Sequence, residues 1–418
     1  MNRGQINNLS RTLCRAVVLA ALCLSPSQWS FEPMAGLHVT PGDIALLLAA
    51  GVWALDTLVR RDWARLWRLP PWPHWLFLGC VAASFLTAPD KGAAVKDFAQ
   101  YVAYFMVGSM LFESFLREGE QCARKALAVL AAVAGAVLAL ALAQYFGGGE
   151  DPLLVRGTFG NRNVLGGFLA LALPFCCAGL MGAPNNAVKT FCAVMLAFGM
   201  AVNLSAASYF AVALVFLCMA AAKGARWFLP VAAGLLLWQN AVLPRLPREN
   251  DIAHYRSVAL YDESGEPERR YPEWQAAYSL VLTHPWTGVG PGNYQKQIGR
   301  YYAQVPRRTG PAEPDTQNLY LVLAASLGLP GLLAFMAMLA YAAAAALRGA
   351  AGAAPEDKRW QARGTAGALG AFAITAIWHP LLVRGIGLPL VFVLALARCI
   401  GQAESTDGKQ ADRSPAHL

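Results

Sequence analysis

The stretch that decides the fold is an uncharged run of 33 residues from Thr190 to Ala222, which reads TFCAVMLAFGMAVNLSAASYFAVALVFLCMAAA. As one helix it would be about 50 Å long at 1.5 Å per residue, whereas the hydrocarbon core of a bilayer is about 30 Å thick. Polar residues interrupt the run at Asn203-Leu204-Ser205. The run therefore predicts two membrane-spanning helices, 186–203 and 205–222.

Composition extends this interpretation to the whole chain of 418 residues. Apolar residues make up 56% of it and charged residues only 14%, against about 25% in an ordinary soluble protein. The charges form clusters between apolar runs that are long enough to cross a bilayer. We therefore expect an all-α fold, a polytopic bundle of about twelve transmembrane helices. The net charge of +9 comes without a nucleic-acid-binding module, so no nucleic acid is expected as a partner.

The first predicted span is a short anchor rather than a signal peptide, because no small-x-small cleavage site follows it. The twelve predicted spans are 16–24, 42–58, 73–89, 98–116, 126–146, 163–181, 186–203, 205–222, 227–243, 317–346, 364–379 and 386–400. They divide the chain into an N-terminal bundle of nine spans (1–243), a large periplasmic loop with short helices (244–316), a C-terminal bundle of three spans (317–400) and a disordered cytoplasmic tail (401–418).

Charge predicts the orientation. With the amino terminus inside, the inner segments and inner span ends carry 20 Lys and Arg against 10 acidic residues, and the outer ones carry 14 against 15. This excess follows the positive-inside rule. Both termini are therefore expected in the cytoplasm, with the chain in the bacterial inner membrane. The nine cysteines all fall in spans or inner segments, and no zinc-spaced cluster occurs, so neither a disulfide nor a metal is expected.

The large loop is longer than the commonest connections, so we look for chemistry there. A helix is predicted over 272–283, because Trp274, Ala277, Tyr278 and Val281 repeat at helical spacing after a proline. Arg269 and Arg270 lie just before its amino terminus, where free N–H groups already favour an anion. An arginine fork there would bind two phosphate oxygens at once. The alternative is a pair of solvated arginines that balance nearby glutamates.

Two further motifs lie on the predicted outer side. The run Gly288-Val289-Gly290-Pro291-Gly292-Asn293 offers either amides that cradle phosphate or a plain tight turn, since Pro291 removes one donor. The run Arg156-Gly157-Thr158-Phe159-Gly160-Asn161-Arg162-Asn163 suits a polar head group, with interfacial anchoring as its alternative. His379 and Arg384, in the last outer turn, are a third candidate and are interpreted as a local cap.

With these residues in view, the sequence resembles the O-antigen ligase and polymerase superfamily of integral membrane proteins. Three stretches carry the resemblance: Arg156 to Asn163 is similar to a GTFGNxN segment, Arg270 to Asn293 to an R-x3-W and HPxxGxGxGN run, and Gln317 to Gly331 to an H-[NSQ]-x9-GxxG motif. The resemblance implies an undecaprenyl-diphosphate-linked oligosaccharide as donor and a glycan, lipid A core or protein as acceptor. It also implies contact with membrane lipids and with polysaccharide assembly or export proteins.

The sequence departs from this family at two charged positions. Gln317 replaces the histidine of the ligase motif, and Ser205-Ala206-Ala207-Ser208 lacks the arginine of the family's Ser-Arg-Gly. Glutamine does not take up a proton near neutral pH, so it cannot act as a general base. These departures favour a polymerase over a ligase, and an R-x10-G pattern reported for some polymerases occurs from Arg156 to Gly167.

The leading hypothesis is a polysaccharide polymerase that uses no metal and no nucleotide sugar. Arg270, with Arg156, Arg162 and Arg269, would hold the donor diphosphate, while Asn161 and Asn318 would also bind the substrate. The candidate catalytic residues are Asp315, His284 and Gln317, the first two as bases and the third to position a sugar. The alternatives are a ligase-like enzyme, a catalytically impaired glycan-binding or accessory protein, and a small-solute transporter. Transport would call for ionisable residues inside the spans, and the predicted span cores carry almost none.

Overall fold

The computed structural model describes residues 3–34, 37–147, 155–246, 270–302, 316–352 and 355–411. The described part is helical except for one antiparallel hairpin of β1 (Phe31–Met34) and β2 (Leu37–Val39), which the sequence did not predict. The helices of the first half are α1 (Arg3–Leu24), α2 (Pro41–Arg60), η1 (Trp63–Arg65), α3 (Trp72–Thr87), α4 (Lys91–Tyr101), the π-helical turn η2 (Val102–Gly108), α5 (Ser109–Leu116), α6 (Glu120–Gly147) and α7 (Arg162–Gly182).

The second half continues in the same manner. Its helices are α8 (Asn186–Val202), α9 (Ala206–Lys223), α10 (Ala225–Leu237), η4 (Trp238–Val242), η5 (Leu243–Arg245), α12 (Arg270–Thr283), α13 (Tyr294–Tyr302), α14 (Leu319–Ala351), α15 (Glu356–Thr375) and α16 (Gly387–Ala411). Each predicted span coincides with one of these helices or with one of two unbroken series, α4-η2-α5 and α10-η4-η5. The segment predicted as a disordered tail is helical as far as Ala411, because Gln, Ala and Glu after the span favour continuation of α16.

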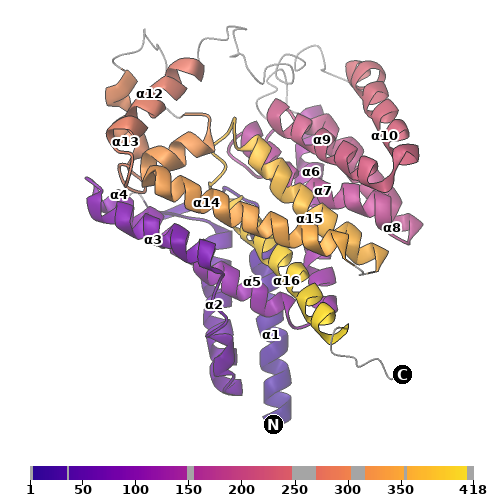
Figure 1. Cartoon of the computed structure of the whole chain (residues 1–418), viewed down its shortest axis with the longest axis horizontal. Coiled ribbons are helices and arrows are strands. Elements are labelled where there is room, and N and C mark those ends of the chain that lie inside the picture. Colours follow the sequence, from indigo (N-terminus) through magenta and orange to yellow (C-terminus); the bar gives the residue numbers. More distant parts are fainter. Residues whose placement is uncertain are drawn as a thin grey trace.

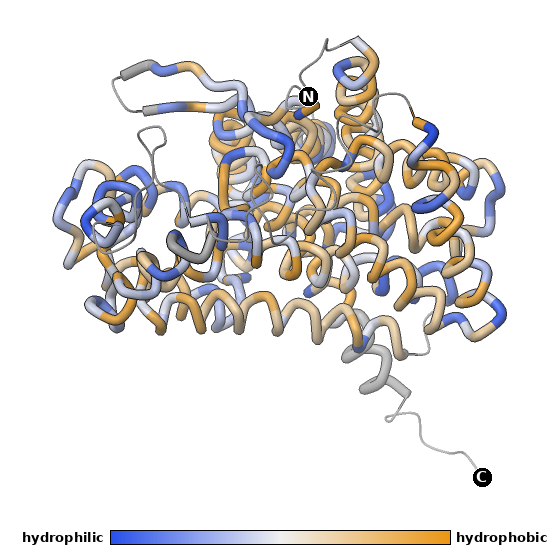
Figure 2. The backbone as a smooth tube through the Cα atoms, turned by 90° about the horizontal axis from the view of Figure 1, so that it is seen from above, coloured by the Kyte–Doolittle hydropathy of each residue, from blue (hydrophilic) through white to orange (hydrophobic). Residues whose placement is uncertain are grey.

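Six helical segments are long and apolar enough to cross a bilayer by length and composition. They are α2, α6, α7, α9, the segment Ala225–Arg245 and α14. Hydrophobic residues follow the middles of the helices, and hydrophilic residues concentrate at helix ends and connections (Figure 2). Apart from the hairpin, the regular elements of the described residues are thus all helical, with the apolar helices of a membrane protein, and twelve crossings remain a prediction.

The predicted division of the run 190–222 is confirmed. α8 ends at Val202 and α9 begins at Ala206, so the three intervening residues leave the helical path. The Asn203 side chain stabilises this break, because its Oδ1 accepts from the Ser205 amide at 3.3 Å and its Nδ2 donates to Ser208 Oγ at 3.0 Å. Ser208 in turn donates to the carbonyl of Gly166 in α7 at 2.6 Å.

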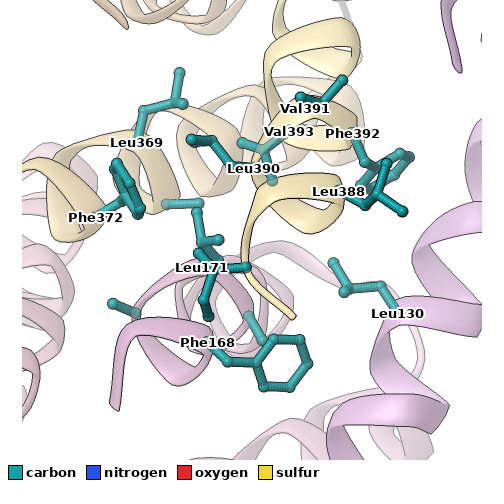
Figure 3. Close-up of a cluster of buried hydrophobic side chains, with 14 of the residues drawn as sticks. Leu130, Phe168, Leu171, Leu369, Phe372, Leu388, Leu390, Val391, Phe392 and Val393 are labelled. Carbon is teal, nitrogen blue, oxygen red and sulfur yellow. The ribbon is translucent and has the colours of Figure 1, made fainter. Parts of the chain in front are cut away.

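The core forms around α7, which packs against α8, α9 and α15. Leu171 of α7 points toward Phe372 of α15, with the buried run 388–393 of α16 beside them (Figure 3). α3, α14, α15 and α16 cross the body of the molecule, while α1 and α2 lie side by side and project from it (Figure 1). All nine cysteines are free thiols.

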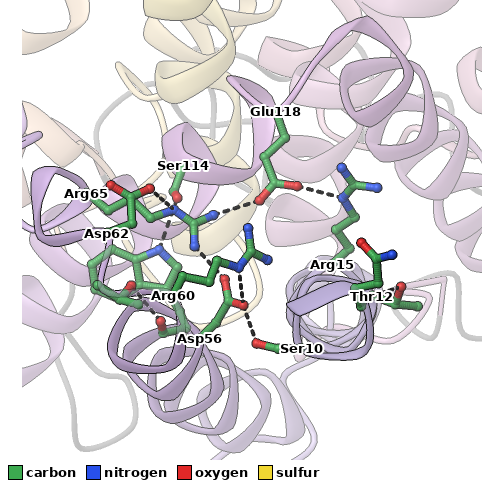
Figure 4. A network of polar contacts seen from close by, with 12 residues as sticks. Ser10, Thr12, Arg15, Asp56, Arg60, Asp62, Arg65, Ser114 and Glu118 are labelled. Atoms are coloured by element: carbon green, nitrogen blue, oxygen red, sulfur yellow. Dashed lines mark hydrogen bonds and ion pairs between the residues drawn. The ribbon is translucent and has the colours of Figure 1, made fainter. Parts of the chain in front are cut away.

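Buried ion pairs lie near the ends of several predicted spans, outside the span cores that were predicted to carry almost no ionisable residues. Arg398 of α16 lies 2.5 Å from the Glu113 carboxylate and 2.9 Å from His74 Nε2, and all three side chains are buried. A second network joins Arg65 to Asp56 at 2.5 Å and to Glu118 at 2.7 Å (Figure 4). Four of these residues lie within one helical turn of the ends of predicted spans: His74, Glu113, Arg398 and Asp56. The span cores themselves therefore do not contain them.

Long-range polar contacts gather the helix ends into two groups. We call the first the Arg65 end; its contacts are Arg15–Glu118, Arg65–Glu118, Arg124–Asp357, Lys358–Glu120, Lys223–Met181 and Arg398–Glu113. We call the second the Gln317 end; its contacts are Gln28–Thr158, Asp90–Asn293, Arg384–Asp43, Ser205–His379 and Leu319–Ala376. Each of these contacts joins two segments that the twelve-span scheme assigns to the same side.

Candidate functional site

The start of α14 is fixed to the end of α15 at the Gln317 end. Asn318 caps α14, because its Oδ1 accepts from the Leu321 amide at 3.1 Å. The Leu319 amide donates to the Ala376 carbonyl at 2.9 Å, and the Tyr320 hydroxyl donates to the Ala373 carbonyl at 2.7 Å. Gln317, half-buried, immediately precedes this junction. Asn318 was predicted to bind the substrate, and the structure gives its side-chain oxygen a capping role.

The first turn of α12 meets the same junction. Thr316 Oγ1 donates to the Glu273 carbonyl at 3.3 Å and also accepts from the Tyr294 hydroxyl of α13. Glu273 is three residues after Arg270, so the backbone of Arg270 lies one helical turn from this contact. The structure therefore brings the Arg270 and Gln317 backbones together, as the resemblance implied. The side chain of Arg270, and the predicted site residues Arg269 and Asp315, lie outside the described residues.

A buried histidine, the third candidate that was interpreted as a local cap, lies beside this junction. His379 follows Ala376 by three residues, is 4% exposed, and has its Nε2 3.0 Å from Ser205 Oγ. Ser205 belongs to the segment in which the family has its Ser-Arg-Gly. The interpretation of His379 as a local cap was therefore wrong. No local pattern could have revealed the contact, because 174 residues separate the two partners.

The patch 156–163 divides into two parts. Arg162 is the first residue of α7 and lies one turn before Gly166, the residue that accepts from Ser208, so it is close to the Ser205–His379 pair. Asn161 caps α7 by accepting from the Val164 amide at 2.9 Å. Arg156 is exposed, and its Nη1 donates to the Gly160 carbonyl within the same loop at 3.4 Å. Arg162 is thus the better placed of the two arginines.

His284 is not part of this cluster. It follows the last residue of α12, is exposed, and has its Nδ1 3.0 Å from Thr283 Oγ1. α12 runs from Arg270 to Thr283, so a rise of 1.5 Å per residue separates His284 from Arg270 by about 20 Å. The structure therefore does not bring His284 together with Arg270 and Gln317.

The glycine-rich run is a packing device, and the phosphate-cradle alternative is wrong. The amides of Val289 and Gly290 donate to the carbonyls of Ala325 and Ser326, both at 2.9 Å, and the Gly292 amide donates to the Asp97 carboxylate. α14 is kinked at Gly328 (φ 75°), two residues before Pro330. The kink breaks the helical hydrogen bonds that these two carbonyls would otherwise accept, so they need other partners. The amides are therefore occupied by protein and not directed at a ligand.

Close backbone contact explains why the run needs glycine. Gly288, Gly290 and Gly292 have φ values of 63°, 94° and 68°, which side chains rarely adopt. A Cβ on Gly290 would lie 2.3 Å from the Ala88 Cβ. The run thus presses against the end of α3 and the kink of α14, and it holds the loop segment against the bundle.

We expect Gly290→Ala to lower the unfolding free energy by about 2 to 3 kcal/mol, because it adds both backbone strain and a clash. Thermal unfolding of the detergent-solubilised protein measures this effect. Gly299→Ala in α13 is the matched control, since a Cβ there meets nothing within 4 Å and alanine favours a helix. An unchanged melting temperature for Gly290→Ala would contradict the packing role.

Electrostatic contacts at the loop reinforce this attachment. Lys296 of α13 is 2.5 Å from the Asp90 carboxylate, and this hydrogen bond lowers the pKa of the Asp90 carboxyl group. Burial raises the pKa of Asp97, while Lys96 and Arg384 act in the opposite direction. Within the described ranges, no three His, Cys, Asp or Glu side chains gather in a way that could hold a metal ion.

Comparison with known families agrees with the resemblance. Residues 191–336 match the family described as O-Antigen ligase. The match runs from α8 into α14 and includes Arg270, Gln317 and the kink at Gly328, whereas the patch 156–163 and His379 lie outside it. No curated protein matches the chain. Over this region, about a third of its length, the chain is similar to the O-antigen ligase family.

Proposed function

We propose that the chain is a membrane glycosyltransferase that polymerises a surface polysaccharide, an O-antigen or an exopolysaccharide, from undecaprenyl-diphosphate-linked glycans at the periplasmic face. The observation that carries the proposal is the junction at the Gln317 end. There the first turn of α12, which begins at Arg270, meets the start of α14, and the Ser205–His379 pair lies beside them. Most of this junction falls within the region that matches the O-antigen ligase family.

The proposed orientation puts the Gln317 end in the periplasm. The contacts within each end support the alternation of the twelve spans, because none of those named above joins an inner segment to an outer one. The excess of Lys and Arg belongs to the segments of the Arg65 end, as the positive-inside rule requires of the cytoplasmic side. A lipid-linked donor would then enter the site sideways from the outer leaflet.

In the proposed reaction, an acceptor hydroxyl oxygen forms a bond to the anomeric carbon of the donor glycan. The bond from that carbon to the phosphate oxygen breaks, and the lipid diphosphate leaves with the electron pair. Arg270 and Arg162 would stabilise the charge that develops on the leaving group, which is the main electrostatic task. Gln317 would position a sugar through its amide, and a base would accept the hydroxyl proton.

His379 joins Asp315 as a candidate for this base. An imidazole takes up a proton near neutral pH, and this one is buried beside the segment that contains Gln317. His284, about 20 Å away along α12, is the weaker candidate.

We expect His379→Ala to lower kcat by about 10²-fold or more and to remove the acidic limb of the pH–rate profile. His379→Gln keeps a hydrogen-bonding group next to Ser205 but cannot accept the proton, so it should be equally impaired. Full activity of His379→Gln would make the histidine structural rather than catalytic. His284→Ala is the control and should retain its activity.

Purified protein supplied with a lipid-diphosphate oligosaccharide tests the function itself. Chain extension, seen as a ladder of longer lipid-linked products, supports the polymerase. Transfer to lipid A core or to protein would instead make the chain a ligase, the function in the name of the matched family. Binding without turnover would make it an accessory protein.

A further inference from the structure

A second feature lies between α9, α14 and α15, and its charged end belongs to the Arg65 end of the molecule. An apolar groove of about 650 Å³ opens there, lined largely by alanine, glycine and methionine. Its lining on α14 runs from Met336 to Ala351, which is about 22 Å at 1.5 Å per residue. One leaflet contributes about 15 Å, half of the 30 Å hydrocarbon core, so the groove is long enough to hold a lipid chain.

The floor of the groove is open because of Gly370. A Cβ at this position would meet no atom within 4 Å. Gly367, one turn earlier in α15, plays a different part, because its missing side chain lets Met219 of α9 approach to 2.6 Å from the Cβ position. α9 and α15 are thus drawn together at Gly367, while space remains beside Gly370.

One end of the groove is cationic. Arg363 is the only charged residue in its lining, and the guanidinium carbon lies 4.2 Å from the centre of the Trp360 ring. The ammonium group of Lys223 lies 5.3 Å from the same ring centre. Among the described residues, neither cation forms an ion pair within 4.0 Å, although Glu356 acts on both at longer range and Lys223 Nζ donates to the Met181 carbonyl.

We propose that this groove binds one anionic phospholipid, with an acyl chain along α14 and α15 and the phosphate on Arg363 and Lys223. Two cations beside an apolar groove complement a lipid that joins a phosphodiester to a hydrocarbon chain, and an arginine fork binds phosphate oxygens well. In the proposed orientation the lipid belongs to the cytoplasmic leaflet.

This site is separate from the proposed catalytic site. α14 runs from Leu319 at the Gln317 end to Ala351 at the groove, a helix of 33 residues and about 50 Å before its kink is considered. The lipid therefore cannot be the glycan donor in its reacting position. The lipid-binding proposal depends only on the groove and the two cations. It would therefore still hold if the protein were not a polymerase.

The test is binding of phosphatidylglycerol to the delipidated full chain, followed by native mass spectrometry. We expect one phosphatidylglycerol molecule to bind at least tenfold more tightly than phosphatidylcholine, and inorganic phosphate at the same concentration not to displace it. Arg363→Ala should remove most of the preference for the anionic lipid. Gly370→Leu should fill the groove and weaken the binding of both lipids.

Two control variants separate the site from general effects. Gly370→Ala leaves most of the groove open and should bind as the unmodified protein does. Arg68→Ala removes an exposed arginine from the same end and should not change the preference. Equal affinity of the unmodified protein for the two lipids, or unchanged phosphatidylglycerol binding by monodisperse Gly370→Leu, would overturn the proposal.

Discussion

Cells whose only copy of the protein carries Arg270→Ala are expected to lose long polysaccharide chains and to accumulate single-repeat, lipid-linked glycan. The reason is electrostatic: removal of one preorganised donor to a departing charged group typically raises a barrier by about 3 to 4 kcal/mol, several hundredfold in rate. Arg270 begins α12, where the N–H groups of the first turn add their own attraction for an anion. Gel analysis of lipopolysaccharide and exopolysaccharide measures the outcome.

Two further variants sharpen this result. Arg270→Lys keeps the charge but loses the planar fork, so an intermediate loss is expected. Arg300→Ala removes an exposed arginine from α13 in the same large loop and should leave polymer length unchanged. If Arg270→Ala, present in the membrane at the normal level, makes polymer of normal length and amount, Arg270 does not hold the diphosphate.

Much of the helical framework was predictable from the sequence, because it follows from hydrophobic length and charge. The division at Asn203 is the clearest case, since the bilayer thickness excluded a single helix and the polar residues marked the break. The helix 272–283 was also predicted correctly, and among its repeating residues Ala277 and Val281 are buried, whereas Tyr278 is not. Tyr278 is 56% exposed, whereas Ala276 and Leu280 are buried. The reason is that α12 packs on α13 and α14, and the sequence of α12 alone does not indicate these partners.

The site was predictable only in part, because a local sequence motif does not indicate which distant residues it contacts in the fold. The glycine-rich run has the composition of an anion-binding loop, yet its amides are taken by the carbonyls that the Gly328 kink releases. The approach of Arg270 to Gln317 followed from family resemblance. The pairing of Ser205 with His379 depends on how α7, α9 and α15 pack, and it needed the structure.

The largest expected effect on stability comes from Arg398→Met. Arg398 and Glu113 are both buried, with 2% and 5% of their side chains exposed, and the carboxylate lies 2.5 Å from the arginine Nε. Removal of one partner from such a pair leaves an uncompensated charge, which typically costs about 3 to 5 kcal/mol. Unfolding of the purified protein in mixed micelles with increasing SDS measures this loss.

A second substitution in the same pair separates the cost of an unpaired charge from the cost of lost packing. Because replacement of both partners of a buried ion pair by apolar residues is often neutral or stabilising, adding Glu113→Leu to Arg398→Met should recover most of the lost free energy. Arg124→Ala is the matched control at the same end: its pair with Glu120 is exposed, so a loss below about 1 kcal/mol is expected. A double variant no more stable than Arg398→Met would mean that Arg398 acts mainly through other contacts, of which the hydrogen bond to buried His74 is the first to test.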